Sequence, residues 1–211
     1  MKFNLLTIDG GKSESIEVSD KIMKLKFNHK LVKYVIDWQL NHQKPRTAKT
    51  KQRNEIRGST KKIYAQKGTG QARHASKKAP LFVGGGQAHG PKGAVYKVKK
   101  INKKVRKLAL AQTMAKKNVD KNFYILSDIK KEIKKTKEFN NFLLNNKISN
   151  ALIVSDKNSE KNFLKSARNI KNIKIINDEG ANIYDMLKFT NVIITSSSMK
   201  KIETRLLDEK N

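Results

Sequence analysis

The chain has 211 residues, no cysteine and a formal net charge of +29 at pH 7. This length fits one domain with an elaboration, and the lack of cysteine excludes disulfide frameworks, zinc ribbons, iron–sulfur ligation and thiol catalysis. No apolar run resembles a secretory signal or a membrane span, so we expect a cytoplasmic protein whose partner is anionic, with nucleic acid the first candidate.

The first forty residues have the pattern of ordinary folded protein. Phe3 to Ile8 predicts a strand, Asp9-Gly10-Gly11 a turn, and Ser15 to Val18 a second short strand. From His29 to about Asn41, apolar residues recur at helical spacing. We therefore expect two short strands followed by a helix.

The segment from residue 44 to residue 100 differs in composition from both flanks. Residues 41–107 contain twenty lysines and arginines against a single acid, Glu55, whereas residues 108–211 contain twenty against twelve acids. All three prolines, eight of the eleven glycines and five of the seven arginines lie in this middle stretch. Because the segment has no sustained periodicity, we expect an extended basic loop, inserted in the domain, that becomes ordered on a polyanion.

After the loop, helices and strands alternate along the chain. Asn102 is a candidate N-cap for a helix from Lys103 to about Lys117. Beyond it we expect, in order, a strand at Phe123–Leu126, a helix at Thr136–Asn146, a strand at Ala151–Val154, a helix at Ser159–Asn169, a strand at Ile173–Ile176, a helix at Ile183–Lys188, a strand at Asn191–Thr195 and a helix at Ser198–Glu209. Short apolar strands separated by helices predict an α/β fold with a parallel sheet that is buried on both faces.

Cations of the loop and of the following helix start are the candidate RNA ligands. Arginine binds phosphate in a bidentate manner, and a phosphate at a helix start also meets free backbone N–H groups. Cations at that helix start otherwise oppose the helix dipole, which favours contact with RNA over a solvated face. The candidate RNA-binding residues are Arg46, Lys49, Lys51, Arg53, Arg57, Lys61, Lys62, Lys67, Arg73, Lys77, Lys78, Lys92, Lys99, Lys100, Lys103, Lys104 and Arg106.

Motifs for other functions are incomplete. The run from Gly68 to Arg73 begins like a dinucleotide fingerprint but lacks the third glycine, and Gly85 and Gly90 have P-loop spacing without the Gly-Lys-Ser/Thr that should follow. The four histidines stand far apart, so no catalytic residue, metal ligand or cofactor is predicted. Two alternatives remain: a nucleic-acid-processing enzyme that uses the loop as a substrate clamp, which would need converging acids, and a membrane-surface or nucleoid-binding protein.

The loop sequence resembles a known family. The run Lys61-Lys62-Ile63-Tyr64-Ala65-Gln66-Lys67-Gly68-Thr69-Gly70-Gln71-Ala72-Arg73, with residues 46–59 before it and 79–86 and 90–91 after it, resembles the signature of universal large-subunit ribosomal protein four, bacterial type. The stretch from Asn102 to Leu110 resembles the family's helix that re-enters the domain. The family usually has Trp-Arg where Tyr64-Ala65 stand and Arg where Gln71 stands, so two charges are absent from the loop tip.

The resemblance implies a three-layer α/β domain whose loop is inserted into rRNA, in a structural, non-enzymatic constituent of the large ribosomal subunit. The implied partners are 23S-type rRNA early in assembly, neighbouring large-subunit proteins and the nascent polypeptide. The loop tip would line the exit tunnel at a narrowing shared with a second loop-bearing protein, near the macrolide site, and some members regulate their own operon. Carried over by position, the tunnel-lining residues are Tyr64, Gln66, Lys67, Gly68, Thr69 and Gly70.

Overall fold

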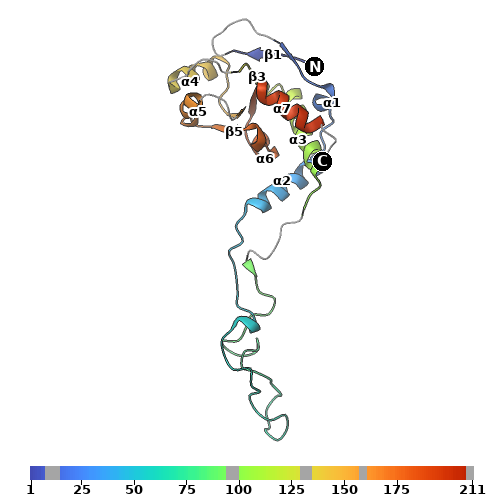
Figure 1. Ribbon diagram of the computed structural model, residues 1–211, viewed down its shortest axis with the longest axis vertical. Helices are drawn as coiled ribbons and strands as arrows, with labels where there is room; N and C mark the ends of the chain where they lie inside the picture. Colours follow the sequence, from blue (N-terminus) through green and yellow to red (C-terminus); the bar gives the residue numbers. More distant parts are fainter. Residues whose placement is uncertain (8–14, 94–99, 129–134, 157–160, 208–211) are drawn as a thin grey trace. The chain divides into compact units, whose positions relative to one another are not determined.

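The computed structural model describes residues 1–7, 15–93, 100–128, 135–156 and 161–207. The predicted turn at residues 9–11, the candidate ligand Lys99 and the predicted helix ends at Ser159 and Glu209 lie outside the described residues. The chain divides into two compact units, one formed by Met1–Leu40 together with Lys100–Asn211 and the other by Asn41–Lys99 (Figure 1). The helices and strands predicted on both sides of the loop belong to the first unit.

A sheet forms the centre of the first unit, and its described strands have the order β2-β1-β3-β6-β4-β5. The strands are β1 (Lys2–Leu6), β2 (Ser15–Glu17), β3 (Phe123–Leu126), β4 (Ala151–Ser155), β5 (Ile173–Asn177) and β6 (Asn191–Thr195). β2 runs antiparallel to β1 at one edge, and the other described pairings are parallel. Leu5 lies opposite Ile125, so the strand before the basic segment pairs with the first strand after it.

Helices cover both faces of this sheet. On one face, α1 (Asp20–Met23), α2 (His29–Gln43), α3 (Lys103–Val119), α6 (Ile183–Lys188) and α7 (Ser196–Leu207) contribute to one hydrophobic cluster. On the other face, α4 (Thr136–Asn145) and α5 (Lys161–Arg168) contribute to a second cluster (Figure 1). The layers are therefore helix, sheet and helix.

The central strands show why the sheet is buried on both sides. Successive side chains of a strand point to opposite faces. On β4, Leu152 and Val154 belong to the first cluster, and Ala151 and Ile153 belong to the second. Every residue of β4 and of β6 is buried, which the nearly all-apolar runs predict. The predicted three-layer α/β fold with a mostly parallel sheet is confirmed.

The structure differs from the expected elements in a few places. The four-residue helix α1 was not predicted, because it is too short to show a helical period. α7 begins at Ser196, two residues earlier than predicted, because Asp128, two residues after the end of β3, accepts a hydrogen bond from the Ser197 N–H at 3.0 Å. Burial alone would raise the pKa of Asp128, but the hydrogen bonds from Ser197 and Ser196 lower it overall.

Candidate nucleic-acid interface

The basic unit, Asn41–Lys99, holds two antiparallel arms together by backbone pairing. Lys49 and Lys92 form an isolated antiparallel bridge. Next to it, the Thr50 N–H donates to the Pro91 carbonyl at 2.9 Å. The outgoing arm also accepts from the returning one, since the Gln87 N–H donates to the Lys51 carbonyl at 2.9 Å. In the described part of the unit, these cross-arm hydrogen bonds hold the two arms together.

Two glycines allow the arms to approach this closely. A Cβ atom on Gly86 would lie 2.2 Å from the backbone nitrogen of Arg53, and a Cβ atom on Gly90 would lie 2.0 Å from the Thr50 hydroxyl oxygen. Contacts under about 3 Å do not occur for real Cβ atoms, so any side chain at Gly86 must push the two backbones apart. The glycine richness of the segment therefore has a structural reason at these positions.

Glu55, the acid that stands alone in this segment, is used inside the outgoing arm. It ends the short 3₁₀ helix Arg53–Glu55 and accepts a hydrogen bond from the Gln52 N–H at 3.1 Å. The other carboxylate oxygen lies 3.9 Å from the Lys49 ammonium. This carboxylate orders the backbone and neutralises at most one neighbouring cation.

Beyond the arms, the chain reverses through a turn that is tied by one aromatic side chain. The Ile63 N–H donates to the Ala75 carbonyl at 3.0 Å, and the Tyr64 hydroxyl donates to the Ala72 carbonyl. Gly68 and Gly70, with φ angles of 83° and 66°, supply the left-handed backbone of the turn. The residues expected at the tip, Gln66 to Gly70, are all exposed, and Tyr64 is half-buried.

The aromatic side chains of this segment pack against each other. His74 contacts the ring of Phe82 edge-on with a centroid distance of 4.9 Å, and the ring of Tyr64 lies 6.5 Å from His74 on an edge-on geometry. These rings support the turn internally. Among the described residues 41–93, these rings therefore offer no row of exposed aromatics on which successive bases could stack.

Nearly all the cations in the described part of the basic unit point to solvent. Thirteen lysines and arginines lie among the described residues 41–93; twelve are exposed, and Lys78 is half-buried. At a surface of this kind, each unneutralised positive charge raises the local potential and attracts phosphates. This arrangement suits a polyanionic partner that reaches the unit from several sides.

Five of the predicted RNA ligands converge on one cavity of about 510 Å³ within the basic unit. They are Arg57, Lys61, Lys62, Lys77 and Lys78. This convergence cannot be read from local sequence, because residues 57–62 and 77–78 meet only after the chain reverses. Its apolar lining by Ile56, Ile63 and Val83 was also missed, since scattered apolar residues have no periodicity.

The remaining predicted ligands do not share this cavity. Within the basic unit, Arg46, Lys49, Lys51, Arg53, Lys67, Arg73 and Lys92 are exposed at other positions along the arms and the turn. Lys100, Lys103, Lys104 and Arg106 belong to the first unit. The structure thus divides the predicted set between two units.

The start of α3 carries Lys103 and Lys104 as exposed side chains. Asn102 occupies the N-cap position, as predicted, but its side chain accepts no hydrogen bond from the helix. The Arg106 guanidinium lies over the Trp38 ring of α2 at 5.1 Å from the ring centroid. A cation–π contact of this kind fixes the position of the guanidinium without neutralising its charge.

Among the described residues, no group of three or more histidines, cysteines, aspartates or glutamates is placed to hold a metal ion. The described helices include none that is long and apolar enough to cross a membrane.

The fold and the site together define a class of protein: a three-layer α/β domain that carries an inserted, acid-poor, cation-rich unit. Residues 16–205 match the sequence profile of the Ribosomal protein L4/L1 family, and the chain belongs to this family. Membership of a family of ribosomal proteins confirms the resemblance and the expectation that the chain is a structural component rather than an enzyme.

Relatives match the chain along nearly its whole length. The "Large ribosomal subunit protein uL4" of Pelagibacter ubique (strain HTCC1062) is 50% identical over 206 residues, covering 97% of this chain and 99% of that protein. The proteins of the same name from Methylobacterium sp. (strain 4-46) and Desulforapulum autotrophicum are 36% and 37% identical, covering 97% and 96% of this chain and 99% and 97% of their own lengths.

Proposed function

We propose that this chain is a structural constituent of the large ribosomal subunit that binds 23S-type rRNA early in assembly. The observation that carries the proposal is the charge distribution of the basic unit. Twelve of its thirteen described cations are exposed, while Glu55 is engaged with its own backbone. The near-complete match to proteins named for the large subunit supports the same conclusion. Its place would be the ribosome in the cytoplasm.

The binding mechanism follows from the surface that the unit presents. Exposed lysines and arginines neutralise phosphates and release counterions, which supplies affinity without reading sequence. The glycine-dependent pairing of the arms keeps the unit thin, so it can lie between RNA helices that are recognised by shape. The cations at the start of α3 would add a second phosphate contact at a helix N-terminus.

The loop tip would line the exit tunnel. In this proposal Tyr64 and the exposed residues Gln66, Lys67, Gly68, Thr69 and Gly70 face the nascent polypeptide and the second loop-bearing protein at the tunnel narrowing. The positive φ angles at Gly68 and Gly70 support a tight turn there, which a tip in a confined space requires. Regulation of the chain's own operon through binding of its messenger RNA stays a prediction. A reporter gene fused to the leader of that messenger would test it.

A sucrose gradient tests the proposal. We expect the full-length chain in a bacterial lysate to sediment with large subunits and to move to the top of the gradient after digestion with ribonuclease. A chain that remains with membranes or with DNA would contradict the proposal and favour the membrane or nucleoid alternative. Turnover of RNA by the purified chain with magnesium, abolished by substitution of a single acid, would instead support the enzyme alternative.

A further inference from the structure

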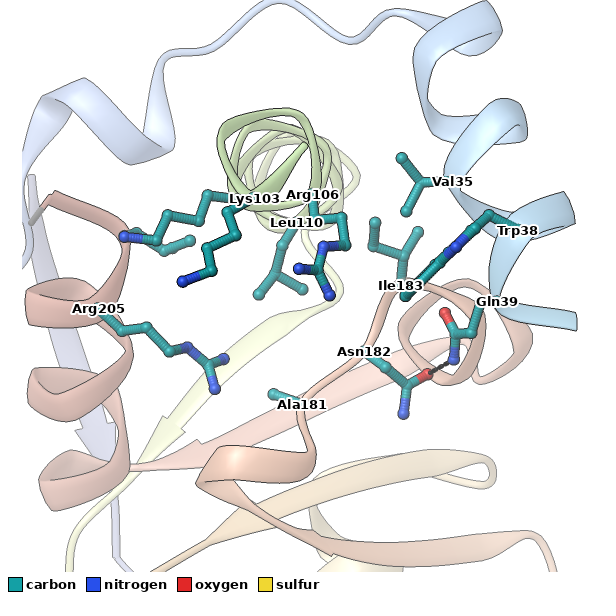
Figure 2. Close-up of a pocket in the computed structure, with 12 residues that line it drawn as sticks. Val35, Trp38, Gln39, Lys103, Arg106, Leu110, Ala181, Asn182, Ile183 and Arg205 are labelled. Carbon is teal, nitrogen blue, oxygen red and sulfur yellow. Dashed lines mark hydrogen bonds between the residues drawn. The ribbon is translucent and has the colours of Figure 1, made fainter. Parts of the chain in front are cut away.

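A second cavity lies within the first unit, among α2, α3, α6 and α7 (Figure 2). Its volume is about 370 Å³. Pockets for small molecules generally measure about 300–1,000 Å³, so this one admits a single compact group and not an RNA helix. Much of its wall is apolar, formed by Val35, Leu110, Ala181, Ile183 and Leu206.

Four cations also line this largely apolar cavity: Lys103, Arg106, Lys107 and Arg205. In Figure 2 the side chains of Lys103, Arg106 and Arg205 point toward the same space. No carboxylate lines the cavity among the described residues. Like charges that converge beside an apolar surface repel each other. An anion placed between them attracts each cation and makes the electrostatic energy of the cluster favourable.

The two guanidinium groups are held in place, and each keeps hydrogen-bonding capacity. Arg205 donates through Nη1 to the carbonyls of Asp178 and Glu179, both at 3.2 Å, while its buried Nη2 has no hydrogen-bond partner among the described residues. Arg106 is fixed over Trp38, and its buried Nε has no partner in the same part of the chain. Buried donors without a partner are rare and call for an explanation.

The opposite wall is rigid before any ligand arrives. Asn182 caps α6 by accepting from the Asp185 N–H at 2.9 Å, and the same oxygen accepts from the Gln39 amide of α2 at 2.9 Å. The Asn182 amide donates to the Asp185 carboxylate at 2.8 Å, and Lys174 donates to that carboxylate at 2.6 Å. The cavity is therefore preformed, which lowers the entropic cost of binding.

We propose that this cavity binds one nucleotide of an unpaired RNA strand. Its phosphate would lie against Lys103, Arg106 and Arg205, and its base would pack on the apolar wall and on the Arg106 guanidinium, which lies over the Trp38 ring. Arginine planes and aromatic rings are the platforms on which splayed-out RNA bases stack, and arginine forks match phosphate. The choice of RNA as the source of this nucleotide rests on the proposed function. An acidic peptide is the competing occupant, which the test must distinguish from the nucleotide.

Trp38 gives a direct readout, since it is the only tryptophan of the chain. We expect nucleoside monophosphates to change the Trp38 fluorescence of the full-length protein in a saturable way, with a dissociation constant of about 1 mM or tighter. A single-stranded oligonucleotide should act at lower concentration than a duplex of the same length. Inorganic phosphate should produce a smaller change, because it has no base to stack.

Two variants and one control make the test specific. Arg205→Gln removes a phosphate ligand, and Ala181→Leu fills the apolar part without changing charge; each should weaken the nucleotide response about tenfold or more. Lys200→Gln removes one exposed charge from the same helix α7 and should leave the response unchanged. Thermal unfolding of all three variants shows whether a variant that no longer responds to nucleotide is still folded. Ala181→Leu does not alter the hydrogen bonds of Arg205, so it tests the cavity independently of them.

Three results would overturn the inference: no saturable response, an equal response to phosphate alone, or tighter binding of an acidic peptide than of the nucleotide. Failure here is distinguishable from failure of the proposed function. Substitution of Arg57, Lys61 and Lys62 in the basic unit should weaken rRNA binding while the Trp38 response to mononucleotides persists. Conversely, Arg205→Gln and Ala181→Leu leave the charges of the basic unit intact.

Discussion

The cavity of the basic unit allows a quantitative prediction about salt. Arg57, Lys61 and Lys62 line this cavity and are exposed. Each phosphate contact contributes about 0.7 for single strands to 0.9 for duplex to the slope of log K against log salt concentration. If all three meet phosphates, replacing them together with glutamine makes the slope shallower by about 2.1 to 2.7. Over a rise from about 50 to 200 mM salt, the affinity gap between wild type and variant then narrows by about 20- to 40-fold.

The assay is equilibrium binding of the full-length protein to large-subunit rRNA at several salt concentrations. The matched control replaces Lys121, Lys165 and Lys171 with glutamine; these lysines are exposed on the first unit and are not candidate ligands. This control variant loses the same number of positive charges as the cavity variant. A difference between the two variants therefore reports where the charges lie and not how many were removed. Parallel lines for wild type and the cavity variant, or an equal change of slope in the control, would refute the reasoning.

Three further changes test the fold. Phe163→Ala removes a fully buried ring from the core beneath α4 and α5, so we expect the free energy of unfolding to fall by about 3–5 kcal/mol and Tm, measured by circular dichroism, to fall by at least about 6 °C. The control Leu144→Ala changes an exposed side chain on α4 and should change Tm little. Equal effects of the two substitutions would contradict the packing. Gly86→Ala should weaken rRNA binding, because the added methyl group separates the two arms, whereas Gly180→Ala, which has open space around it, should not. If protease sensitivity and rRNA affinity are both unchanged in Gly86→Ala, the arms accommodate the methyl group and the prediction is wrong. Lys117→Met leaves two carbonyls at the end of α6 without their 2.9 Å hydrogen bonds, so the free energy of unfolding measured in urea should fall by about 1–3 kcal/mol. An unchanged midpoint of urea unfolding would show that water replaces the ammonium group.

Local sequence predicted the elements whose stability comes from a regular apolar pattern. β4 and β6 were predicted because nearly every residue in them is apolar, and α3 because its buried face recurs at helical spacing. The start of α7 was misplaced because its first turn depends on Asp128, which lies far away in the chain. Elements fixed by a distant partner carry no local signal.

The candidate sites divide in the same way. Composition identified the cations of the basic unit, since their excess over acids is visible in the sequence alone. Their convergence was not visible, because Lys61 and Lys78 meet only through the turn that Tyr64 ties. The cavity of the first unit was missed altogether: its lining comes from four separate parts of the chain, and neither Trp38 nor Arg205 stands in a motif.

The pairing of β1 with β3 has a consequence for how the basic unit can change during evolution. Because Leu5 and Ile125 are neighbours in the sheet, the ends of the intervening chain are brought together by the fold of the first unit. The entropy of closing such a loop grows only with the logarithm of its length, by about 0.6 kcal/mol for each doubling. Lengthening or shortening the arms therefore changes the stability of the sheet very little, so their length is free to follow the depth of whatever they bind.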